Sequence, residues 1–576
     1  MLYLQKRPQM DNRTIIGLLS TIGLALCFQA SPALAQITVN TAEGLREALI
    51  AAGGPTTIVM QPGRYDLWPE DGHKEWVFVS NTSSEEETAD KTKVFGIWID
   101  GLKDITIKGY GARVVCHGDM TPIGINESRN ITLEGLEVDF ERPGMSEFTC
   151  ISSVPGKTVC RFHKDSRYVI EDGTLELVGE GWITETPHCV RYFPAEGRLY
   201  YSEDWDVFHD SKAVEIEPGL VCFETPEDFK AVPGDVLTVR DRIRRQTGSL
   251  IQYSENILLE GMKYRFMHGL GVVSQFTRNI SIVDCVFTPS EDSGRVIASS
   301  ADFAHFSGCA GLVEVRGCRF CGAHDDPINV HGTNLRAVRK VSDRTVVVRF
   351  CHGQTYGLKA FRPGDKVCFE RAETLERYSE STVLDAERLD DYEIRLTLDR
   401  NLPDGLRLGS NCVENLTWTP EVIISGNEFS RTSTRGILLT TPRKAVIENN
   451  VFRHVGMNGI LIAGDAADWF ESGPVCDVTI RGNRFEDCTF NGGPDNAYIA
   501  IHPSNTVVDK AIPVHRNIRI EGNTFVLRDG CPALSAKSVC GLQEEISALL
   551  KDFPGEAGVA VAVGKDRINR QKSASD

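Results

Sequence analysis

Short stretches of alternating apolar and polar residues recur along most of the chain, each followed by a turn and a phenylalanine. In each stretch, branched apolar residues recur at every second position, which predicts a strand with one buried face. The Gly-Asn or Asn-Asn step that follows offers a residue tolerant of positive φ, so a tight turn is expected there. The eight copies span residues 130–140, 256–266, 279–287, 312–320, 422–429, 445–452, 478–485 and 518–525.

The spacing of these copies predicts a solenoid. Phe429 and Phe452 are 23 residues apart, an interval that suits an all-β, right-handed parallel β-helix with three short strands per coil. Leucine-rich repeats have a similar period but need a leucine-dense core, which this motif does not offer. We therefore expect the motif phenylalanines to form one buried column. The asparagines of four copies should align in one turn: Asn427, Asn450, Asn483 and Asn523.

The segments between the repeats predict additional elements. An amphipathic helix around Leu45–Ala52 should cap the open end of the solenoid, whose strand edges are otherwise unpaired. Residues 146–247 and 334–420 lack the motif but keep strand-like alternation, and both contain a Pro-Gly-Asp phrase, after Val232 and Arg362. They predict two β-rich, barrel-like insertions. Two interpretations stay open. Either the insertions form the walls of a cleft, or they stabilise the solenoid or form an oligomer contact.

After Phe525 one more coil is expected, followed by a helix over residues 544–553 and a tail without an assigned function. The sequence thus predicts seven segments. They are a signal peptide (1–35), an N-terminal cap with the first coils (36–145), insertion I (146–247), coils with candidate catalytic acids (248–333), insertion II (334–420), C-terminal coils (421–543) and a tail (544–576).

The N-terminus and the charge restrict location and partners. Basic residues, an apolar run and Ala33-Leu34-Ala35 predict a secretory signal cleaved before Gln36, and hence a periplasmic or extracellular protein. No later stretch reaches the ~18 to 20 apolar residues of a membrane span. A net charge of −18 argues against nucleic acid as a partner. The dispersed cysteines, Cys318 and Cys321 among them, predict buried thiols rather than a metal or redox site.

Three aspartates are the candidate catalytic residues. Asp302 precedes the pair Asp325-Asp326 by about one coil, so we expect Asp302 to stack over Asp325 and three carboxylates to share one wall. Like charges raise one another's pKa, and such clusters persist mainly where protons are transferred. The competing interpretation is a turn in which the Asp-Asp-Pro side chains bond to backbone amides. Asp302, one coil upstream, and three nearby histidines favour a catalytic role over the turn interpretation.

The same repeat predicts residues that contact a substrate. The sixth residue after the motif phenylalanine is Asp326, Arg435 or Asn458 in three copies, so these side chains should stack on successive coils. Trp469, in the loop that follows, could stack on a sugar ring or pack under its own loop. The full set of expected substrate-binding residues is Arg295, His305, His324, Asn329, His331, Arg435, Asn458 and Trp469. No metal and no cofactor are expected, because the acids have no other coordinating residues around them.

Several chemistries fit acids on the side of a β-helix. Glycoside hydrolysis needs one carboxyl group to protonate the leaving oxygen and another to activate water. Polysaccharide lyases on this fold use acids to bind Ca²⁺ and an Arg or Lys as the base. No lysine lies near the acids, but Arg295 and Arg435 remain candidates for that base. Secreted β-helices also serve as adhesins, although acids concentrated between two insertions favour an enzyme.

The sequence resembles glycoside hydrolase family 110 from about Ile37 to about Leu542. The resemblance is specific in SADFAHFSGC (300–309) and GAHDDPINVHGT (322–333). It implies an inverting exo-α-galactosidase that removes terminal α-1,3-linked galactose from blood group B or linear glycans, so the expected partner is a glycan with terminal α-galactose. The oligomeric state, including a homo-oligomer, is left open. After Leu542 the expected further coil is not recognisable.

Polygalacturonases of family 28 resemble the chain more distantly and share an Asp…Asp-Asp constellation. By that analogy Asp325 is the general acid, while Asp302 and Asp326 position and deprotonate water. Carboxylates on adjacent coils predict the short separation of ~5 to 5.5 Å that usually accompanies retention. Inversion is therefore implied by the resemblance alone.

Overall fold

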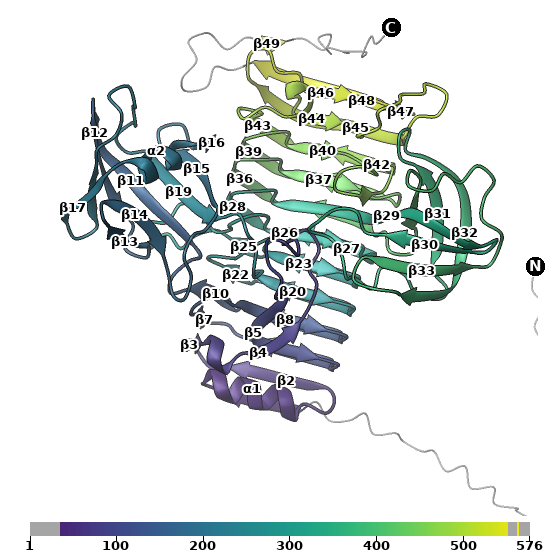
Figure 1. Ribbon diagram of the computed structural model, residues 1–576, viewed down its shortest axis with the longest axis horizontal. Helices are drawn as coiled ribbons and strands as arrows, with labels where there is room; N and C mark the ends of the chain where they lie inside the picture. Colours follow the sequence, from purple (N-terminus) through teal and green to yellow (C-terminus); the bar gives the residue numbers. More distant parts are fainter. Residues whose placement is uncertain (1–34, 551–561, 564–576) are drawn as a thin grey trace, which may run out of the picture.

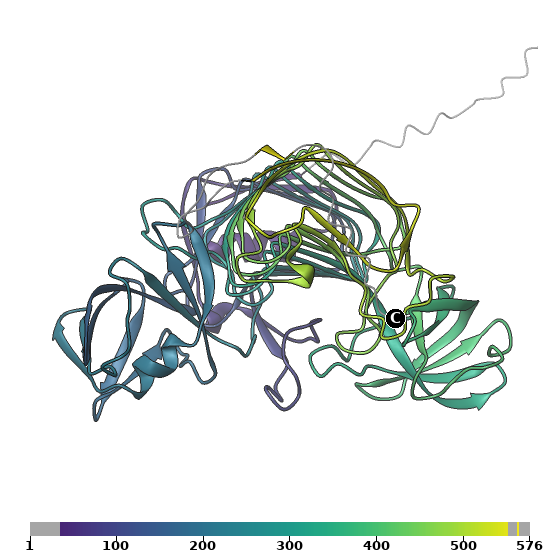
Figure 2. The same cartoon turned by 90° about the horizontal axis from the view of Figure 1, so that it is seen from above.

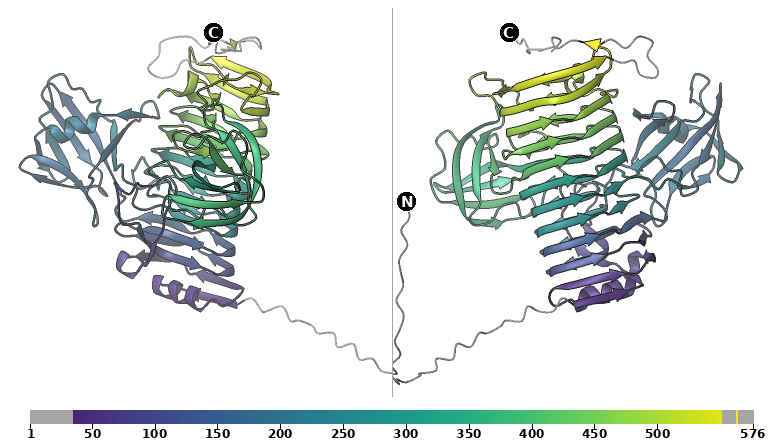
Figure 3. Two further views of the ribbon diagram at one scale, coloured as in Figure 1. Left: turned by 45° about the vertical axis from the view of Figure 1, so that its right-hand side comes forward. Right: turned by 180° about the vertical axis from the view of Figure 1, so that it is seen from behind.

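The computed structural model describes residues 35–550 and 562–563, which form a stack of coils with two β-rich insertions (Figure 1). The predicted signal peptide lies outside the described residues. Each regular coil contributes three strands, and strands of successive coils pair in parallel. The coils are seen edge-on from behind in the right-hand view of Figure 3.

The strands form three faces. The first face comprises β1 (Ala35–Val39), β2 (Thr56–Met60), β6 (Lys103–Lys108), β9 (Arg129–Glu134), β21 (Glu255–Glu260), β24 (Arg278–Val283), β27 (Ala310–Arg316), β35 (Glu421–Ser425), β38 (Ala445–Glu448), β42 (Cys476–Arg481) and β45 (His515–Leu527). The second comprises β3 (Gly63–Leu67), β7 (Ala112–Cys116), β10 (Glu137–Phe140), β22 (Lys263–Tyr264), β25 (Val286–Phe287), β28 (Arg319–Ala323), β36 (Glu428–Thr432), β39 (Val451–Val455) and β43 (Arg484–Cys488). The third comprises β5 (Thr92–Asp100), β8 (Thr121–Asn126), β20 (Ser249–Gln252), β23 (Val272–Gln275), β26 (Ala304–Ser307), β29 (Ile328–Ser342), β37 (Ile437–Thr440), β40 (Ile460–Ile462), β44 (Ile499–Ile501) and β46 (Leu534–Ala536).

The predicted asparagine ladder is confirmed. The side-chain amide of Asn427 donates to Asn450 Oδ1, Asn450 donates to Asn483, and Asn483 donates to Asn523, each at 2.9 Å. The residue before each ladder asparagine has the positive φ that the sequence predicts, as at Gly426 (66°) and Asn449 (55°). The ladder pairs buried amide groups that would otherwise destabilise the turn.

The phenylalanine column is confirmed for six motif copies. Phe287, Phe320, Phe429, Phe452, Phe485 and Phe525 stack with ring centroids 4.6 to 5.1 Å apart. In the first two copies the prediction is wrong, because the strand register puts Val138 and Tyr264 in the column. Phe140 and Phe266 lie two residues further along and contact each other edge to face at 5.9 Å. Tyr264 fills the same space as a phenylalanine and stacks on Phe287.

The sequence predicted a helix near each end of the solenoid. Helix α1 (Ala42–Ala51) covers the first coil with Leu45, Ala48 and Leu49 buried, and Thr41 caps its N-terminus. The helix predicted over 544–553 is wrong where the structure describes it, because β48 (Gln543–Leu550) pairs in parallel with β45 and forms the coil that the sequence did not reveal. Strand pairing with a preceding coil overrides the helix propensity of Glu, Ala and Leu here.

Insertion I contains β11 (Met145–Val154), β12 (Lys157–Phe162), β13 (Arg167–Glu171), β14 (Thr174–Val178), β15 (Pro187–Phe193), β16 (Arg198–Ser202), α2 (Asp204–Asp210), β17 (Ala213–Glu217), β18 (Leu220–Phe223) and β19 (Val236–Asp241). In insertion II, the end of β29 closes a barrel with β30 (Thr345–Arg349), β31 (Lys366–Arg371), β32 (Glu376–Arg388), β33 (Glu393–Leu398) and β34 (Cys412–Asn415). Each has its own apolar core.

The two insertions project from the same side of the coil stack and diverge (Figure 2). Between them lies the segment from residue 68 to residue 91, which includes β4 (His73–Trp76). Asn81 of this segment accepts a hydrogen bond from Arg244 of insertion I at its carbonyl oxygen, and its side chain bonds to Thr355 of insertion II. The segment therefore connects the two insertions. No helix among the described residues is long and apolar enough to cross a membrane.

Candidate active site

The three aspartates lie in the turn that precedes the third-face strands. Ala304 pairs with Ile328, so the register places Asp302 level with Asp326. The sequence analysis predicted that Asp302 would stack over Asp325, and this prediction is wrong. The coil here is one residue longer than the 23-residue interval assumed from the sequence. Ile328 in turn pairs with Ile437, and Ile437 with Ile460. Asp302, Asp326, Arg435 and Asn458 therefore follow one another on successive coils.

Asp326 is held by Arg435 of the next coil. Its Oδ1 accepts the Arg435 backbone N–H at 3.0 Å, and its Oδ2 accepts Nε and Nη2 of the guanidinium at 3.0 and 2.6 Å. Burial raises the pKa of Asp326 to about 7, although the Arg435 cation opposes this rise. The neighbouring charge of Asp325 raises the pKa further. Asp326 is thus an ion-paired carboxyl group that titrates near neutral pH.

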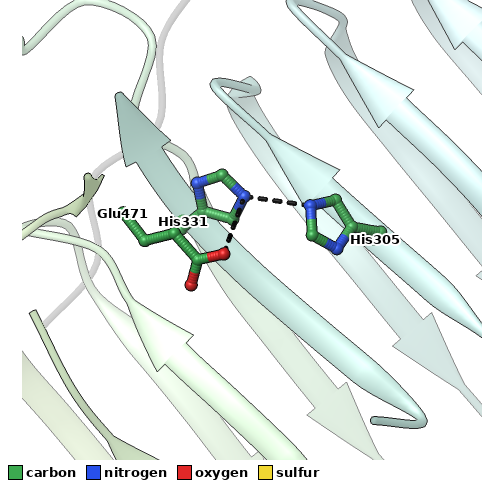
Figure 4. A group of neighbouring side chains, drawn as sticks. All are labelled: His305, His331 and Glu471. Carbon is green, nitrogen blue, oxygen red and sulfur yellow. Dashed lines mark hydrogen bonds and ion pairs between the residues drawn. The ribbon is translucent and has the colours of Figure 1, made fainter. Parts of the chain in front are cut away.

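Asp302 begins a chain of hydrogen bonds through two histidines, of which Figure 4 shows the inner part. Its Oδ2 lies 2.8 Å from His305 Nδ1, His305 Nε2 lies 3.0 Å from His331 Nε2, and His331 Nδ1 lies 2.7 Å from the Gly332 carbonyl oxygen. A carbonyl only accepts, so His331 Nδ1 carries the hydrogen and its Nε2 accepts from His305. With both imidazoles neutral, His305 Nδ1 is then an acceptor and Asp302 the donor.

Electrostatics agree with this proton arrangement. Burial, and then the charge of Asp325, raise the pKa of Asp302 well above its usual range. Burial lowers the pKa of His305 to about 4. Both shifts favour a protonated Asp302 beside a neutral His305 in the free protein. Asp302 and Asp326 are therefore equivalent in fold position but differ in charge.

Asp325 is the most exposed of the three acids, with 26 % of its side chain accessible, against 4 % for Asp302 and 1 % for Asp326. Its Oδ1 accepts the Asp326 backbone N–H at 3.1 Å, as the turn interpretation expected. Its Oδ2 lies 3.6 Å from Nη2 of Arg244, at the end of insertion I. One residue thus combines a turn contact with a side chain directed toward insertion I.

A pocket of about 250 Å³ lies over the acids. Of the expected site residues, Asp302, His305, Asp325, Asp326, Asn329, Arg435 and Trp469 line it. Trp469 is 39 % exposed and stacks on His352 of insertion II, with ring centroids 4.1 Å apart. The pocket is smaller than most sites for drug-sized ligands, and its size suits a single sugar residue.

Four of the expected binding residues have contacts elsewhere. Arg295 is buried against Asp139 at 2.8 Å, and His324 Nε2 lies 2.7 Å from the Thr238 hydroxyl. His331 lies behind His305, and the side-chain amide of Asn458 donates to backbone carbonyls, including that of Pro494 at 3.3 Å. None of the four is among the described residues that line the pocket. Repeat spacing places a residue on a coil but does not fix the direction of its side chain.

The sequence analysis missed several polar residues of the pocket, among them Asn81, Arg244 and Glu471. Glu471 accepts a hydrogen bond from the Asn81 side chain at 2.7 Å and lies 3.7 Å from His331 Nε2. Asn81 and Arg244 come from segments far from the acids in sequence. Glu471 follows Trp469 by two residues, and that proximity is the one signal that could have identified it.

Among the residues that the structure describes, one group has the composition of a metal site. The ligand atoms of His305, His331 and Glu471 lie within 4.8 Å of one another. The two imidazoles already pair with each other, and Glu471 accepts from Asn81. These hydrogen bonds satisfy the group without an ion.

Comparisons with known proteins agree with this architecture. Two family models, GLAA-B beta-barrel domain I and domain II, match residues 146–237 and 345–410, and a right handed beta helix region matches residues 411–531. The β-helix family model is right-handed, as the repeats predicted. A mannuronan C-5 epimerase module from Azotobacter vinelandii shares 11 % identity over 91 % of this chain and 95 % of its own, at a TM-score of 0.33, too weak a likeness to add to the fold argument.

Several named relatives are much more similar in sequence. The chain is 47 % identical to "Alpha-1,3-galactosidase A" of Bacteroides fragilis, over 88 % of this chain and 84 % of that one. It is 36 % identical to "Alpha-1,3-galactosidase A" of Bacteroides thetaiotaomicron, over 87 % of each, and 33 % identical to the Streptomyces avermitilis protein of the same name, over 88 % and 83 %. Shared helix, shared barrels and identity along nearly the whole length show that the chain belongs to the α-1,3-galactosidases of glycoside hydrolase family 110.

Proposed function

We propose that the protein is an exported exo-glycosidase that releases terminal α-1,3-linked galactose from glycans with inversion. The observation that carries the proposal is the set of three carboxyl groups in different environments at one pocket of about 250 Å³. The relatives named α-1,3-galactosidase support the substrate class. The secretory signal predicted for residues 1–35 supports export.

The proposed reaction assigns one role to each acid. Asp325 gives a proton to the oxygen that links galactose to the rest of the glycan, and the bond between that oxygen and galactose C1 breaks. Water attacks C1 from the opposite face, and Asp326, which Arg435 helps to keep ionised, takes the water proton. Asp302 orients the water through its hydrogen-bonded carboxyl group. The products are β-galactose and a glycan with a free hydroxyl group, and protons exchanged with solvent restore both acids.

The lyase alternative is less well supported by the site. A lyase on this fold needs a basic side chain to abstract a proton from the sugar. Arg295 and Arg435, the two candidates, are each committed to an aspartate, at 2.8 and 2.6 Å. An arginine in such a pair is held in its charged form and cannot serve as a base.

The test compares two substrates that differ in the leaving group. The wild-type protein should release galactose from an α-1,3-galactosyl disaccharide and from α-galactosyl fluoride. Asp325→Asn should lower kcat on the disaccharide by about 10²- to 10⁴-fold and affect the fluoride far less, because fluoride leaves without protonation. The exposed Asp343→Asn variant controls for the substitution itself, and melting temperatures check folding.

Two outcomes would contradict the proposal in different ways. Failure of the wild-type protein to release galactose from either substrate would reject the function. Equal losses on both substrates in a folded Asp325→Asn protein would reject Asp325 as the acid but keep the function.

A further inference from the structure

The direction of Asp325 indicates where the rest of the glycan lies. A general acid must contact the oxygen that leaves, so the sugar attached to that oxygen lies on the side that the acid faces. This step rests on the proposed function. Asp325 faces insertion I, since its Oδ2 is 3.6 Å from Arg244 Nη2. Its charge also acts on Tyr201 of insertion I, where burial first and Asp325 second raise the phenol's pKa.

Another part of the pocket is lined by residues that follow the acids in the chain. They are Leu461, Trp469, Glu471 and Ser504, and Trp469 stacks on His352 of insertion II. This part suits the terminal galactose, whose apolar ring face an exposed indole can cover. The glycan beyond that galactose must then leave the pocket toward insertion I.

A groove continues from the acids along insertion I. Arg244 lines both the acid pocket and a neighbouring cavity of about 50 Å³, which also includes Trp182, His268 and Ser300. That small cavity shares Asp119, Trp182, Ile183 and Arg245 with an open groove of about 600 Å³. The three hollows therefore adjoin one another from the acids to the outer surface of insertion I.

The groove has the features of a carbohydrate site. Trp182 offers a partly buried indole, Ile183 beside it is 56 % exposed, and Arg245 provides a planar polar group. Three residues that line the small cavity between the acids and this groove each have a buried nitrogen without a hydrogen-bond partner among the described residues: Trp182 Nε1, Arg244 Nε and His268 Nε2. His268 is itself 8 % exposed. An unpaired buried polar atom is costly, so a ligand hydroxyl or a water molecule would be stabilised there.

We propose that this groove, from Arg244 to Trp182, binds the neutral sugar next to the terminal galactose. Trp182 covers the apolar face of its ring, and the unpaired nitrogen atoms beside it contact its hydroxyl groups. Insertion I is then the element that distinguishes glycans by the sugar to which their terminal galactose is attached.

The experiment measures kcat/KM for an α-1,3-galactosyl trisaccharide and for α-galactosyl fluoride, whose leaving group is a single atom and leaves the groove empty. Trp182→Ala should lower the trisaccharide value by about three- to tenfold, the contribution expected of one aromatic contact, and leave the fluoride value unchanged. Trp182→Phe, which keeps a ring face, should lose less. Tyr110→Ala, an exposed aromatic on the coil stack, should alter neither value.

Three results would overturn the proposal while the protein remains a galactosidase. They are an equal loss on both substrates in folded Trp182→Ala protein, no loss on either, and a selective trisaccharide loss in Tyr201→Ala with none in Trp182→Ala. The last result would place the sugar against the β15–β16 hairpin. Absence of galactose release by the wild-type protein from both substrates would instead reject the proposed function.

Discussion

Three aspartates of one short stretch acquire different properties from their neighbours. Asp326 is buried against a guanidinium, Asp302 is buried against an imidazole, and Asp325 is partly exposed. The same chemical group can therefore be an ion-paired carboxyl group, a neutral carboxylic acid or a partly exposed carboxyl group. Environments that separate the pKa values of neighbouring carboxyl groups are what acid and base catalysis require.

The ion pair between Asp326 and Arg435 predicts a pH dependence. A base must be ionised, and burial raises the pKa of Asp326 to about 7, so kcat/KM should fall as the pH falls through about 7. Arg435 lowers that pKa, hence Arg435→Met should raise it and move the acidic limb to higher pH by at least about one pH unit. The measurement is the pH profile of kcat/KM for the disaccharide.

A matched control separates this effect from a general change in charge. Arg443 donates to Thr419 and to the Leu416 carbonyl rather than to an acid, so Arg443→Met should leave the acidic limb in place. An acidic limb that stays unmoved in folded Arg435→Met protein would contradict the role given to Asp326.

The sequence predicted the candidate acids better than their partners. Asp302 and the pair Asp325-Asp326 were found because about one coil separates them, and Arg435 because it occupies the repeat position of Asp326. Asn81, Arg244 and Glu471 carry no such signal, since they reach the pocket from segments without the motif. Arg295 and His324 were expected in the pocket, but their side chains instead contact Asp139 and Thr238. Side-chain direction depends on packing that spacing does not encode.

At the scale of elements, one buried carboxylate fastens insertion I to the active-site coil. Glu147 on β11 accepts the backbone N–H groups of Val296 and Ile297 at 3.0 to 3.2 Å. These residues lie five or six positions before Asp302. Burial raises the pKa of Glu147 to about 7, because ionising a carboxyl group away from water costs free energy.

Removing this acceptor should destabilise the protein. Glu147→Ala leaves two buried N–H groups unpaired, at about 1–3 kcal/mol each, so the free energy of unfolding should fall by about 2 to 6 kcal/mol in denaturant titrations at pH 8. Glu147→Gln is the matched control, because its amide oxygen can accept both N–H groups as Oε1 does now, and no buried charge remains. A Glu147→Ala protein as stable as the wild type would show that this contact does not hold the insertion.

The elements themselves were predictable where one signal dominated. Period-two alternation and the Gly-Asn step identified strands and turns, because both reflect local backbone and burial constraints. The column position of Tyr264 and the strand at Gln543–Leu550 were missed, since both depend on pairing with the neighbouring coil. The sequence analysis made the coil that contains the acids one residue too short. It therefore predicted Asp325, rather than Asp326, as the residue that stacks on Asp302.

At the scale of the whole molecule, the site is assembled between units that the sequence keeps apart. Insertion I supplies Arg244, the segment from 68 to 91 supplies Asn81, and the coils supply the acids. The sequence predicted that two insertions exist but left their role open. Asn81 contacts both insertions, although all three segments are far apart in the sequence. The position of the insertions beside the pocket therefore follows from the folded structure and not from the sequence pattern.

The most direct test of the central claim is time-resolved proton NMR of an α-1,3-galactosyl disaccharide treated with the wild-type protein. Hydrolysis by water attack opposite the leaving group predicts that β-galactose appears first and that α-galactose follows only as mutarotation proceeds. First appearance of α-galactose would contradict inversion and indicate a covalent intermediate. An unsaturated sugar, or no free galactose, would contradict the claim that this site is a galactosidase.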